Sequence, residues 1–418
     1  MKKTVGIAGG GAAGLFAAVL LAQAGVSVTV LEALPRVGKK LLSTGNGRCN
    51  LTNLHAEMEC YHGDGSLLRN VLSAFPPEKT LEAFRKLGLY TIADEEGRVY
   101  PRSQTAASVL DALRLQCGEL GVEMLCGERV EAVKRTKNGF SVRFGDEYRS
   151  FDVLLLTCGS RAASQTDGYA LAEGLGLKIT PTVPALCPVP VKGEAIKSLK
   201  GLRTRARVML LADGKPARDG YGKILSAEGE VQFTEKALSG ICVFDLSRWC
   251  NLWQKTGTVA GKRVGKLTLS LDVLPEIEQK AAFLRELVQT LAERNAEDLL
   301  SGLFPKRLGQ VLLKNVWDGS LNTPVRELPK NLPERLARVL ANWEWEPNGV
   351  VPWNQAQVAA GGVAAGELDA ETLEAKRMEN LYLAGEILDV DGICGGFNLQ
   401  WAWASAAAAV RAILEKKV

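Results

Sequence analysis

The first 32 residues carry the pattern that most restricts how this chain can fold. Residues 9–14 read Gly-Gly-Gly-Ala-Ala-Gly and match G-x-G-x-x-G. A strand-like run at 4–8 precedes the match, a helix-like run at 12–24 begins within it, and an alternating strand-like run at 27–31 follows. A lone match is weak, but this order of elements is the context that makes it informative. We therefore predict a βαβ unit and an α/β, Rossmann-like fold.

The glycines of this unit and one acid after it predict a dinucleotide ligand. Gly9 allows the tight turn, Gly11 lets the backbone approach a pyrophosphate, and Gly14 lets the helix pack closely. The N–H groups and positive dipole at the helix start favour phosphate. Glu32, 18 residues after Gly14, would accept hydrogen bonds from the adenosine ribose hydroxyls. The contacts predicted in the turn are at Gly9, Gly11, Ala12, Ala13 and Gly14.

The same stretch has an alternative interpretation as a targeting segment. Residues 4–31 contain no charged side chain and follow Lys2 and Lys3, as in a signal peptide or a membrane span. Six glycines interrupt the stretch, however, and its parts have different periodicities. No later segment has 18 uninterrupted apolar residues. We therefore expect a cytoplasmic protein that does not bind a membrane.

Charge and cysteine content exclude several classes of protein. The 418 residues include 51 Lys and Arg against 47 Asp and Glu, a net charge of +4, and no block of basic residues. This balance predicts no nucleic-acid partner. Nine cysteines without a C-x-x-C pair argue against a disulfide framework and a zinc ribbon. With only His55 and His62 available, we predict no metal site.

A polar, glycine-rich loop follows the βαβ unit. Residues 43–53 read Ser-Thr-Gly-Asn-Gly-Arg-Cys-Asn-Leu-Thr-Asn and offer amide and hydroxyl donors with one Arg. Such a loop can line the ribityl chain and pyrimidine edge of a flavin, which favours FAD over NAD; the alternative is a solvated surface loop. The predicted cofactor contacts here are Lys39, Lys40, Gly45, Asn46, Gly47, Arg48 and Asn50.

Further cofactor contacts are expected from segments far along the chain. Residues 127–133 and 139–142 predict a strand pair that offers backbone groups at Val130 to an adenine, and 151–159 predict a buried strand that ends at Cys158 and Gly159. A strand near 380 is followed by a Gly-Gly turn and a helix at 399–416, for which Asn398 suits the N-cap. The contacts predicted here are Gly385, Glu386, Asp391, Gly395, Gly396, Phe397, Asn398 and Leu399.

Three of these segments together resemble one family. Residues 9–14, the T-G-x-G-R-C-N-x-T-N loop at 44–53 and the run 384–400 are similar to the BaiN/YhiN-type flavoproteins, also described as aminoacetone-oxidase-like or 3-dehydro-bile-acid reductase-like. The resemblance implies one bound FAD, a discontinuous FAD-binding domain and two inserted subdomains. Members often carry F-T-H-x-G-x-S-G-P, whereas residues 233–241 here read Phe-Thr-Glu-Lys-Ala-Leu-Ser-Gly-Ile. No role of that His carries over.

The sequence is compatible with this layout. We predict an FAD-binding domain at 1–187 and 352–418, an inserted β-rich, barrel-like subdomain at 188–273, and an inserted helical subdomain at 274–351. Prolines cluster at the first boundary, the runs after it alternate, and 275–294 have a helical apolar face. The tryptophans at 317, 343, 345 and 353 suit core packing better than a cofactor site.

The expected chemistry is hydride transfer between flavin N5 and a small organic substrate. Our first hypothesis, from the resemblance, is a reductase of a conjugated C=C bond in a steroid, bile-acid-like or other enone. No second G-x-G-x-x-G exists, so NADH or NADPH would bind transiently as donor. The alternatives are an O₂-dependent oxidase of a small amine such as aminoacetone, and a non-catalytic flavin-binding or RNA-modification-related protein. Candidates beside the flavin ring are Arg48, Cys394 and Asn398.

Overall fold

The apolar run at the N-terminus forms the middle strand of a parallel sheet in this computed structural model, which describes residues 3–162 and 168–416. Its neighbours come from both halves of the chain, in the order β23-β11-β1-β2-β7, and all four pairings are parallel. The strands are β1 (Thr4–Ala8), β2 (Ser27–Glu32), β7 (Glu123–Cys126), β11 (Val153–Leu156) and β23 (Leu381–Leu383). The buried inner strands confirm the predicted Rossmann-like fold.

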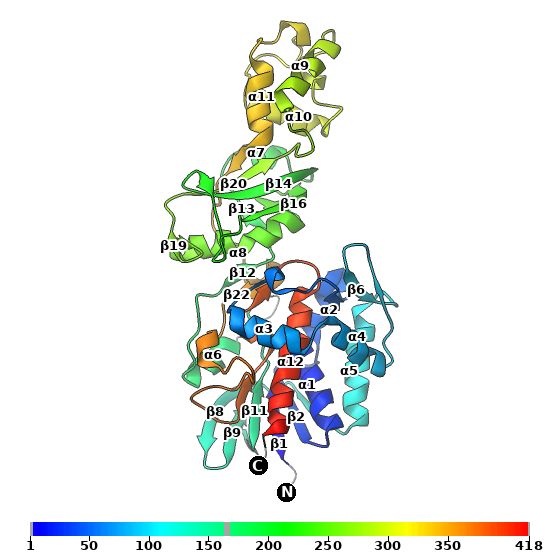
Figure 1. Cartoon of the computed structure of the whole chain (residues 1–418), viewed down its shortest axis with the longest axis vertical. Helices are drawn as coiled ribbons and strands as arrows, with labels where there is room; N and C mark the ends of the chain where they lie inside the picture. Colours follow the sequence, from blue (N-terminus) through cyan, green and yellow to red (C-terminus); the bar gives the residue numbers. More distant parts are fainter. Residues whose placement is uncertain (1–2, 163–167, 417–418) are drawn as a thin grey trace. The chain divides into compact units, whose positions relative to one another are not determined.

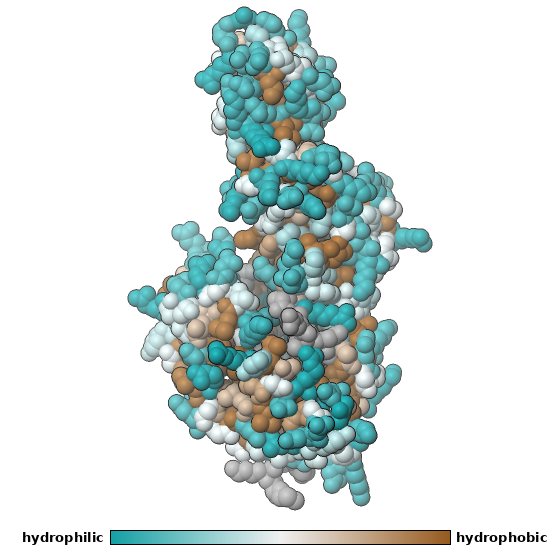
Figure 2. Space-filling view, turned by 180° about the vertical axis from the view of Figure 1, so that it is seen from behind, coloured by the Kyte–Doolittle hydropathy of each residue, from teal (hydrophilic) through white to brown (hydrophobic). Residues whose placement is uncertain are grey.

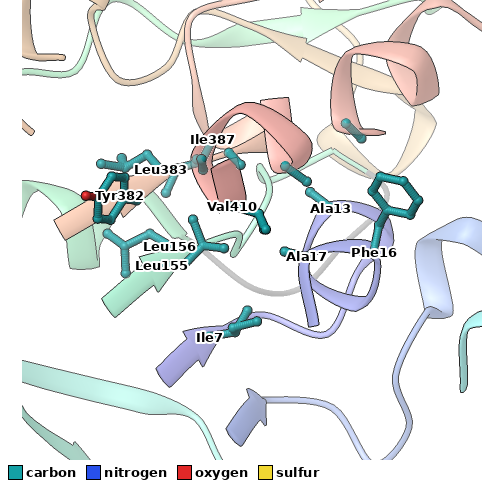
Figure 3. Close-up of a cluster of buried hydrophobic side chains, with 14 of the residues drawn as sticks. Ile7, Ala13, Phe16, Ala17, Leu155, Leu156, Tyr382, Leu383, Ile387 and Val410 are labelled. Atoms are coloured by element: carbon teal, nitrogen blue, oxygen red, sulfur yellow. The ribbon is translucent and has the colours of Figure 1, made fainter. Parts of the chain in front are cut away.

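Two long helices lie side by side against this sheet (Figure 1). They are α1 (Ala12–Gln23), which directly follows β1, and α12 (Phe397–Glu415), which ends the described chain. Both are rich in alanine, so their backbones can approach closely. Figure 3 shows Ala17 of α1, Val410 of α12 and Leu156 of β11 in the resulting core. The N-terminus is tied to the same helix, because the ammonium of Lys3 donates to the carbonyl of Ile413 (2.9 Å) in its last turn.

An aromatic cluster joins three helices. The ring of Phe84, on α4 (Pro77–Lys86), stacks on Phe16 of α1 at 5.6 Å and meets Trp403 of α12 edge-on at 5.0 Å. All three side chains are buried. Since aromatic pairs add to the energy of burial, this cluster fixes α12 beside α1.

The remaining elements of this part of the chain surround the sheet. The predicted strand pair is confirmed as two strands of an antiparallel meander, with a bulge between Val130 and Ala132. The strands are β3 (Thr52–Asn53), β4 (Tyr61–His62), β5 (Thr91–Ala93), β6 (Arg98–Pro101), β8 (Val130–Thr136), β9 (Gly139–Phe144), β10 (Glu147–Phe151), β22 (Val358–Ala360) and β24 (Asp391–Gly392). The helices are α2 (Lys39–Ser43), α3 (Gly65–Ala74), α5 (Ala106–Glu119) and α6 (Gly168–Gly174).

The chain divides into two compact units. Unit 1 is Met1–Val183 with Ala356–Val418, and unit 2 is Pro184–Gln355. Unit 2 contains an antiparallel sheet of order β13-β17-β16-β14-β20-β21, with β15 paired to β14. Its strands are β13 (Val189–Pro190), β14 (Arg203–Ala212), β15 (Lys215–Pro216), β16 (Ser226–Phe233), β17 (Ala237–Ser239), β18 (Thr258–Val259), β19 (Lys262–Arg263), β20 (Leu267–Asp272) and β21 (Trp343–Trp345).

Helices interrupt unit 2 more than the sequence patterns predict. The run 188–273 reads as strands throughout but contains α8 (Ile241–Thr256), whose buried face includes Trp249. The other helices are α7 (Ala195–Ser198), α9 (Lys280–Thr290), α10 (Lys306–Lys314) and α11 (Leu332–Ala341). The last three lie between β20 and β21, which pair with each other. One continuous cluster of buried side chains includes strands and helices alike, and the division into β-rich and helical subdomains stays a prediction.

The prediction that the tryptophans pack in a core is confirmed for one pair. Trp343 and Trp345 are buried in the core of unit 2, with ring centroids 4.9 Å apart.

On the face shown in Figure 2, hydrophilic residues are interspersed with smaller hydrophobic areas. Within the described ranges, no helix is both long enough and apolar enough to cross a membrane.

Replacing Phe84 by Ala should destabilise unit 1. The change removes a ring that is fully buried between Phe16 and Trp403, and such truncations cost about 3–5 kcal/mol. Urea unfolding followed by tryptophan fluorescence measures the loss. The control is Leu115→Ala, because Leu115 is 55% exposed on α5 and its truncation should change stability by less than about 0.5 kcal/mol. Equal unfolding midpoints for the two variants would contradict the role of the cluster.

Candidate cofactor-binding site

The predicted cofactor segments meet at one edge of the parallel sheet. Residues 9–14 follow β1, Glu32 ends β2, Cys158 and Gly159 follow β11, and Gly385 follows β23. All four strands run in the same direction, so their carboxyl ends share an edge. Ligands of open α/β sheets bind at this edge.

The turn between β1 and α1 is shaped by what its glycines face. Gly9 has φ +110°, and a Cβ there would lie 2.5 Å from the carbonyl oxygen of Thr157. A Cβ on Gly14 would lie 2.0 Å from the carbonyl oxygen of Gly9. Gly11 differs, because a Cβ there would have no described atom within 4 Å. Gly9 and Gly14 therefore serve the protein's own packing, whereas Gly11 faces open space that a phosphate group can enter.

Glu32 is held against this turn. Its side chain is buried, and its two carboxylate oxygens accept hydrogen bonds from the N–H groups of Gly10 and Leu34, both at 2.8 Å. A carboxylate oxygen accepts more than one hydrogen bond, so the predicted contact with ribose hydroxyls stays a prediction that this geometry permits. The two backbone bonds orient the carboxylate before any ligand arrives.

The polar loop at 44–50 has a constrained backbone. Asn46 and Cys49 both have φ between +55° and +60°, a conformation that non-glycine residues adopt rarely. The side chain of Cys49 is fully buried, and burial raises its pKa to about 12. It therefore stays a thiol at neutral pH and anchors the loop. Strained backbone of this kind gathers at ligand sites.

Asn50 supplies a buried acceptor. Its Oδ1 has no hydrogen-bond partner among the described residues, and a Cβ on Gly396 would lie 2.6 Å from that atom. A buried acceptor without a donor costs about 1–3 kcal/mol. The predicted contact of Asn50 with a cofactor would supply that donor.

The start of α12 corrects one prediction. The N-cap is Gly396 (φ +100°), the helix begins at Phe397, and Asn398 lies inside its first turn. The Asn398 side chain instead holds Gly392, donating from Nδ2 to its carbonyl (2.8 Å) and accepting from its N–H (2.9 Å). Asn398 therefore closes the turn at 392–398. The N-cap residue Gly396 has no side chain that could cap the first N–H groups of α12, which suits this helix start to a ligand.

Gln400 is a site residue that the sequence analysis did not single out. It is fully buried on α12; its Oε1 accepts from the hydroxyls of Thr52 (2.7 Å) and Thr80 (2.8 Å), and its Nε2 donates to the carbonyl of Phe75 (2.8 Å). The Asn53 amide adds a bond from Nδ2 to the carbonyl of Gly395 (2.9 Å). The end of the polar loop is thus attached to the start of α12. The available signal was an amide on a helix face otherwise made of Ala and Trp.

Two other predicted contacts bind each other. The ammonium of Lys40 lies 2.5 Å from Oε2 of Glu386, and both side chains are partly exposed. The other oxygen of Glu386 accepts from the hydroxyl of Ser160 (2.8 Å) and the N–H of Ala359 (3.0 Å). The pair joins α2 to the segment after β23. Contacts of either residue with a cofactor stay predictions.

The remaining predicted residues lie around this edge. Arg48 is exposed, with its guanidinium 4.6 Å from the centre of the Tyr100 ring. Cys394 is half-buried. Burial raises the pKa of the Cys158 thiol to about 12, which argues against a thiolate at Cys158. The other predicted contacts differ in their exposure to solvent. Those that are buried are Asp391 and Phe397; those that are half-buried are Val130, Cys158, Gly395 and Leu399; and those that are exposed are Lys39, Asn46 and Gly47. No described group of three or more His, Cys, Asp and Glu could hold a metal ion.

The arrangement suits a long dinucleotide. It combines open space at a glycine turn, a fixed acid after β2, an unpartnered buried amide oxygen and an uncapped helix start. The residues present therefore fit FAD, and we predict that its pyrophosphate would lie at the start of α1 and its flavin beside the polar loop and α12.

Comparison with known proteins identifies the family. Residues 3–412 match the model described as HI0933-like protein Rossmann domain. The chain is 39% identical to the 3-dehydro-bile acid delta(4,6)-reductase of Clostridium scindens, over 99% of both chains. It is 28% identical to the ribosomal RNA dihydrouridine synthase of Escherichia coli, over 98% of both. The 3-ketosteroid delta1-dehydrogenase of Sterolibacterium denitrificans aligns over 100% of both chains with 14% identity and a TM-score of 0.45.

The chain therefore belongs to the HI0933-like family, and the resemblance found in its sequence is confirmed. It is an enzyme, a flavoprotein oxidoreductase with an FAD-binding Rossmann-like domain.

Alanine substitutions should separate the two roles of the glycines. Gly11→Ala should leave the fold intact but weaken FAD binding at least tenfold, because the new methyl group enters the space reserved for phosphate. Gly14→Ala should lower the melting temperature as well, because its Cβ would overlap the carbonyl of Gly9. Flavin absorbance per protein and thermal melting by circular dichroism measure the two effects. Gly118→Ala, in open space on α5, is the neutral control. Full flavin content in Gly11→Ala would refute the assignment.

Replacing Gln400 by Leu should loosen the flavin site. The change leaves two hydroxyls and one carbonyl without their partner, at about 1–3 kcal/mol for each buried group that water cannot reach. We expect a lower urea midpoint and loss of flavin during purification. Gln289→Leu, an exposed position on α9, is the matched control. A stable variant with full flavin content would show that Gln400 does not position the loop.

Proposed function

We propose that this member of the HI0933-like family is an NAD(P)H-dependent reductase of a C=C bond conjugated to a carbonyl group. The observation that carries the proposal is the 39% identity, over 99% of both chains, to a protein named 3-dehydro-bile acid delta(4,6)-reductase. A steroid-like 3-oxo compound with a 4,6-diene is therefore our first substrate class.

The chemistry of a second relative is compatible with the same reaction. Dihydrouridine is uridine with its C5=C6 bond reduced, and that bond is conjugated to the C4 carbonyl. Relatives named ribosomal RNA dihydrouridine synthase are 28% and 27% identical to this chain over 97–98% of its length. In uracil, a hydride adds to the carbon β to the carbonyl and a proton adds to the α carbon. In a 4,6-dienone, the hydride adds to the β carbon or to the δ carbon at the end of the longer conjugation, and a proton completes the reduction of each bond. A uracil ring in RNA is therefore the second candidate.

The residues of this chain support such a step by orientation and charge. A bound flavin supplies the hydride from its reduced N5. The uncapped N–H groups at the start of α12 would stabilise negative charge beside them. Asn398 closes the turn before that helix and Gln400 attaches the helix to the polar loop, and we regard both as positioning residues.

The electron donor follows from the single dinucleotide motif. The chain has no second G-x-G-x-x-G, so we expect NADH or NADPH to reach the flavin transiently and leave before the organic substrate enters. An amine oxidase would use the same cofactor but would take electrons from its amine and pass them to O₂.

Anaerobic reduction should distinguish these functions. NADH or NADPH should bleach the 450 nm absorbance of the bound flavin within seconds, and an enone substrate should restore it under anaerobic conditions. A 3-oxo-4,6-diene steroid and a uridine-rich RNA should be tested in parallel. Aminoacetone with O₂, followed by peroxide detection, is the control for oxidase activity. Bleaching by the amine and not by either nicotinamide would overturn the proposal.

A further inference from the structure

The charges of this chain are divided unequally between the two units. Residues 184–355 contain 25 Lys and Arg against 19 Asp and Glu, a net charge of +6. The rest of the chain has 26 against 28, a net charge of −2. The balanced total of +4 therefore hides a basic unit 2, the part of the chain that does not carry the predicted FAD contacts.

Two of these cations lie at one end of the unit 2 sheet. Ala212, the last residue of β14, pairs with Lys215 across the β14–β15 turn and with Leu267 across β20, so Lys215 and Lys266 flank the same strand end. The carboxylate of Asp213 fixes this turn by accepting from the N–H groups of Lys266 (2.8 Å) and Gly265 (3.4 Å).

The β18–β19 hairpin, which precedes β20 along the chain, supplies two further cations. Lys262 and Arg263 form β19, and the N–H of Val264 after them donates to the carbonyl of Gly257 (3.0 Å). We call Lys215, Lys262, Arg263 and Lys266 the basic end; all four residues are exposed.

The basic end has no ion-pair partner among the described residues. Within residues 3–162 and 168–416, none of its four side chains makes an ion pair or a hydrogen bond. The neighbouring cations of β14 behave differently, since Arg205 and Arg207 both bind Glu228 at 3.1 Å. The carboxylate of Asp213 accepts from backbone N–H groups. The carboxylate of Glu346 is bound to the ammonium of Lys192 at 2.5 Å, and Lys266 also helps to lower the pKa of Glu346.

An exposed aromatic ring lies in the loop that follows β15. This loop returns to β14, where the N–H of Leu210 donates to the carbonyl of Leu225 and the N–H of Ala217 donates to the carbonyl of Leu210. Tyr221 in the loop is 74% exposed, the largest exposed fraction among the described large hydrophobic side chains. Exposed cations and an exposed aromatic ring in one unit suit single-stranded nucleic acid, because cations contact phosphates and a ring stacks on a base.

We propose that the basic end and Tyr221 form a binding surface for single-stranded RNA. The proposal goes beyond the reductase reaction, because it assigns a polyanionic partner to unit 2 whichever ring the flavin reduces. The expectation that the chain has no nucleic-acid partner rested on the total charge and on contiguous basic blocks, and it stays untested. The cations here come from separate segments, at 215 and at 262–266, and the pairings of β14 bring Lys215 and Lys266 to the same strand end.

Fluorescence anisotropy of the flavin-loaded full chain with a labelled 20-nucleotide uridine-rich RNA tests the proposal. We expect binding that weakens steeply between 50 and 200 mM salt. Replacing Lys215, Lys262, Arg263 and Lys266 by Ala should weaken binding at least tenfold and flatten the salt dependence. The matched control replaces four exposed cations of unit 1 by Ala: Arg85, Lys134, Lys137 and Lys178. It removes the same charge and should bind RNA as the unchanged protein does.

Tyr221 tests stacking separately. Tyr221→Ala should weaken binding about fivefold or more without changing the salt slope, and Tyr221→Trp should restore it. Equal RNA affinity for the basic-end variant and its control would overturn the proposal. So would binding to phosphatidylserine vesicles in place of RNA.

Flavin reduction by NAD(P)H, measured on the same samples, should be unchanged in all these variants. RNA binding without enone reduction would refute only the proposed function. Enone reduction without RNA binding would refute only the surface.

Discussion

The close approach of α1 to the end of β1 is the constraint on which the cofactor site depends. A Cβ on Gly14 would overlap the carbonyl of Gly9, and one on Gly9 would overlap the backbone after β11. Because neither atom exists, the turn fits between two parallel strands, where the N–H of Gly9 donates to the carbonyl of Leu31. Glu32 reinforces this arrangement through its bond from Gly10. The site therefore begins with backbone geometry, and few side chains are needed to hold phosphate there.

The sequence predicted the elements whose signals are local. The βαβ unit carries a change of hydrophobic period at each boundary, and its strands and helix begin and end within one residue of the prediction. The helix at the C-terminus shows the limit of the same method. Asn398 has the right chemistry for an N-cap, but Gly396 can adopt the left-handed backbone before the helix, and Asn398 bonds to Gly392 instead. Propensity ranks residues for a position, whereas tertiary contacts choose the position.

The pairings within the site could not be predicted, because their partners are far apart along the chain. Lys40 and Glu386 were both proposed as cofactor contacts, yet nothing in the sequence indicates that they bind each other across the sheet edge. The three partners of Gln400 come from a strand, a helix and the turn between α3 and α4, and their meeting depends on where α4 and the polar loop pack. The total charge of the chain likewise could not predict a basic surface, because a sum over all residues does not say which cations lie on the same surface.

The two units bear on two different properties of this enzyme, the reaction that it catalyses and the substrate that it binds. Unit 1 carries the predicted FAD contacts, and the hydride transfer proposed for it is compatible with a steroid-like enone and with a uracil ring alike, since both have a C=C bond conjugated to a carbonyl. The reacting bond therefore cannot select between the substrates; selection requires contacts with the rest of the molecule. A steroid has an extended apolar body, whereas RNA has a phosphate at every nucleotide. Exposed cations do nothing for the first and attract the second, so RNA affinity at the basic end would favour the RNA substrate class over the steroid.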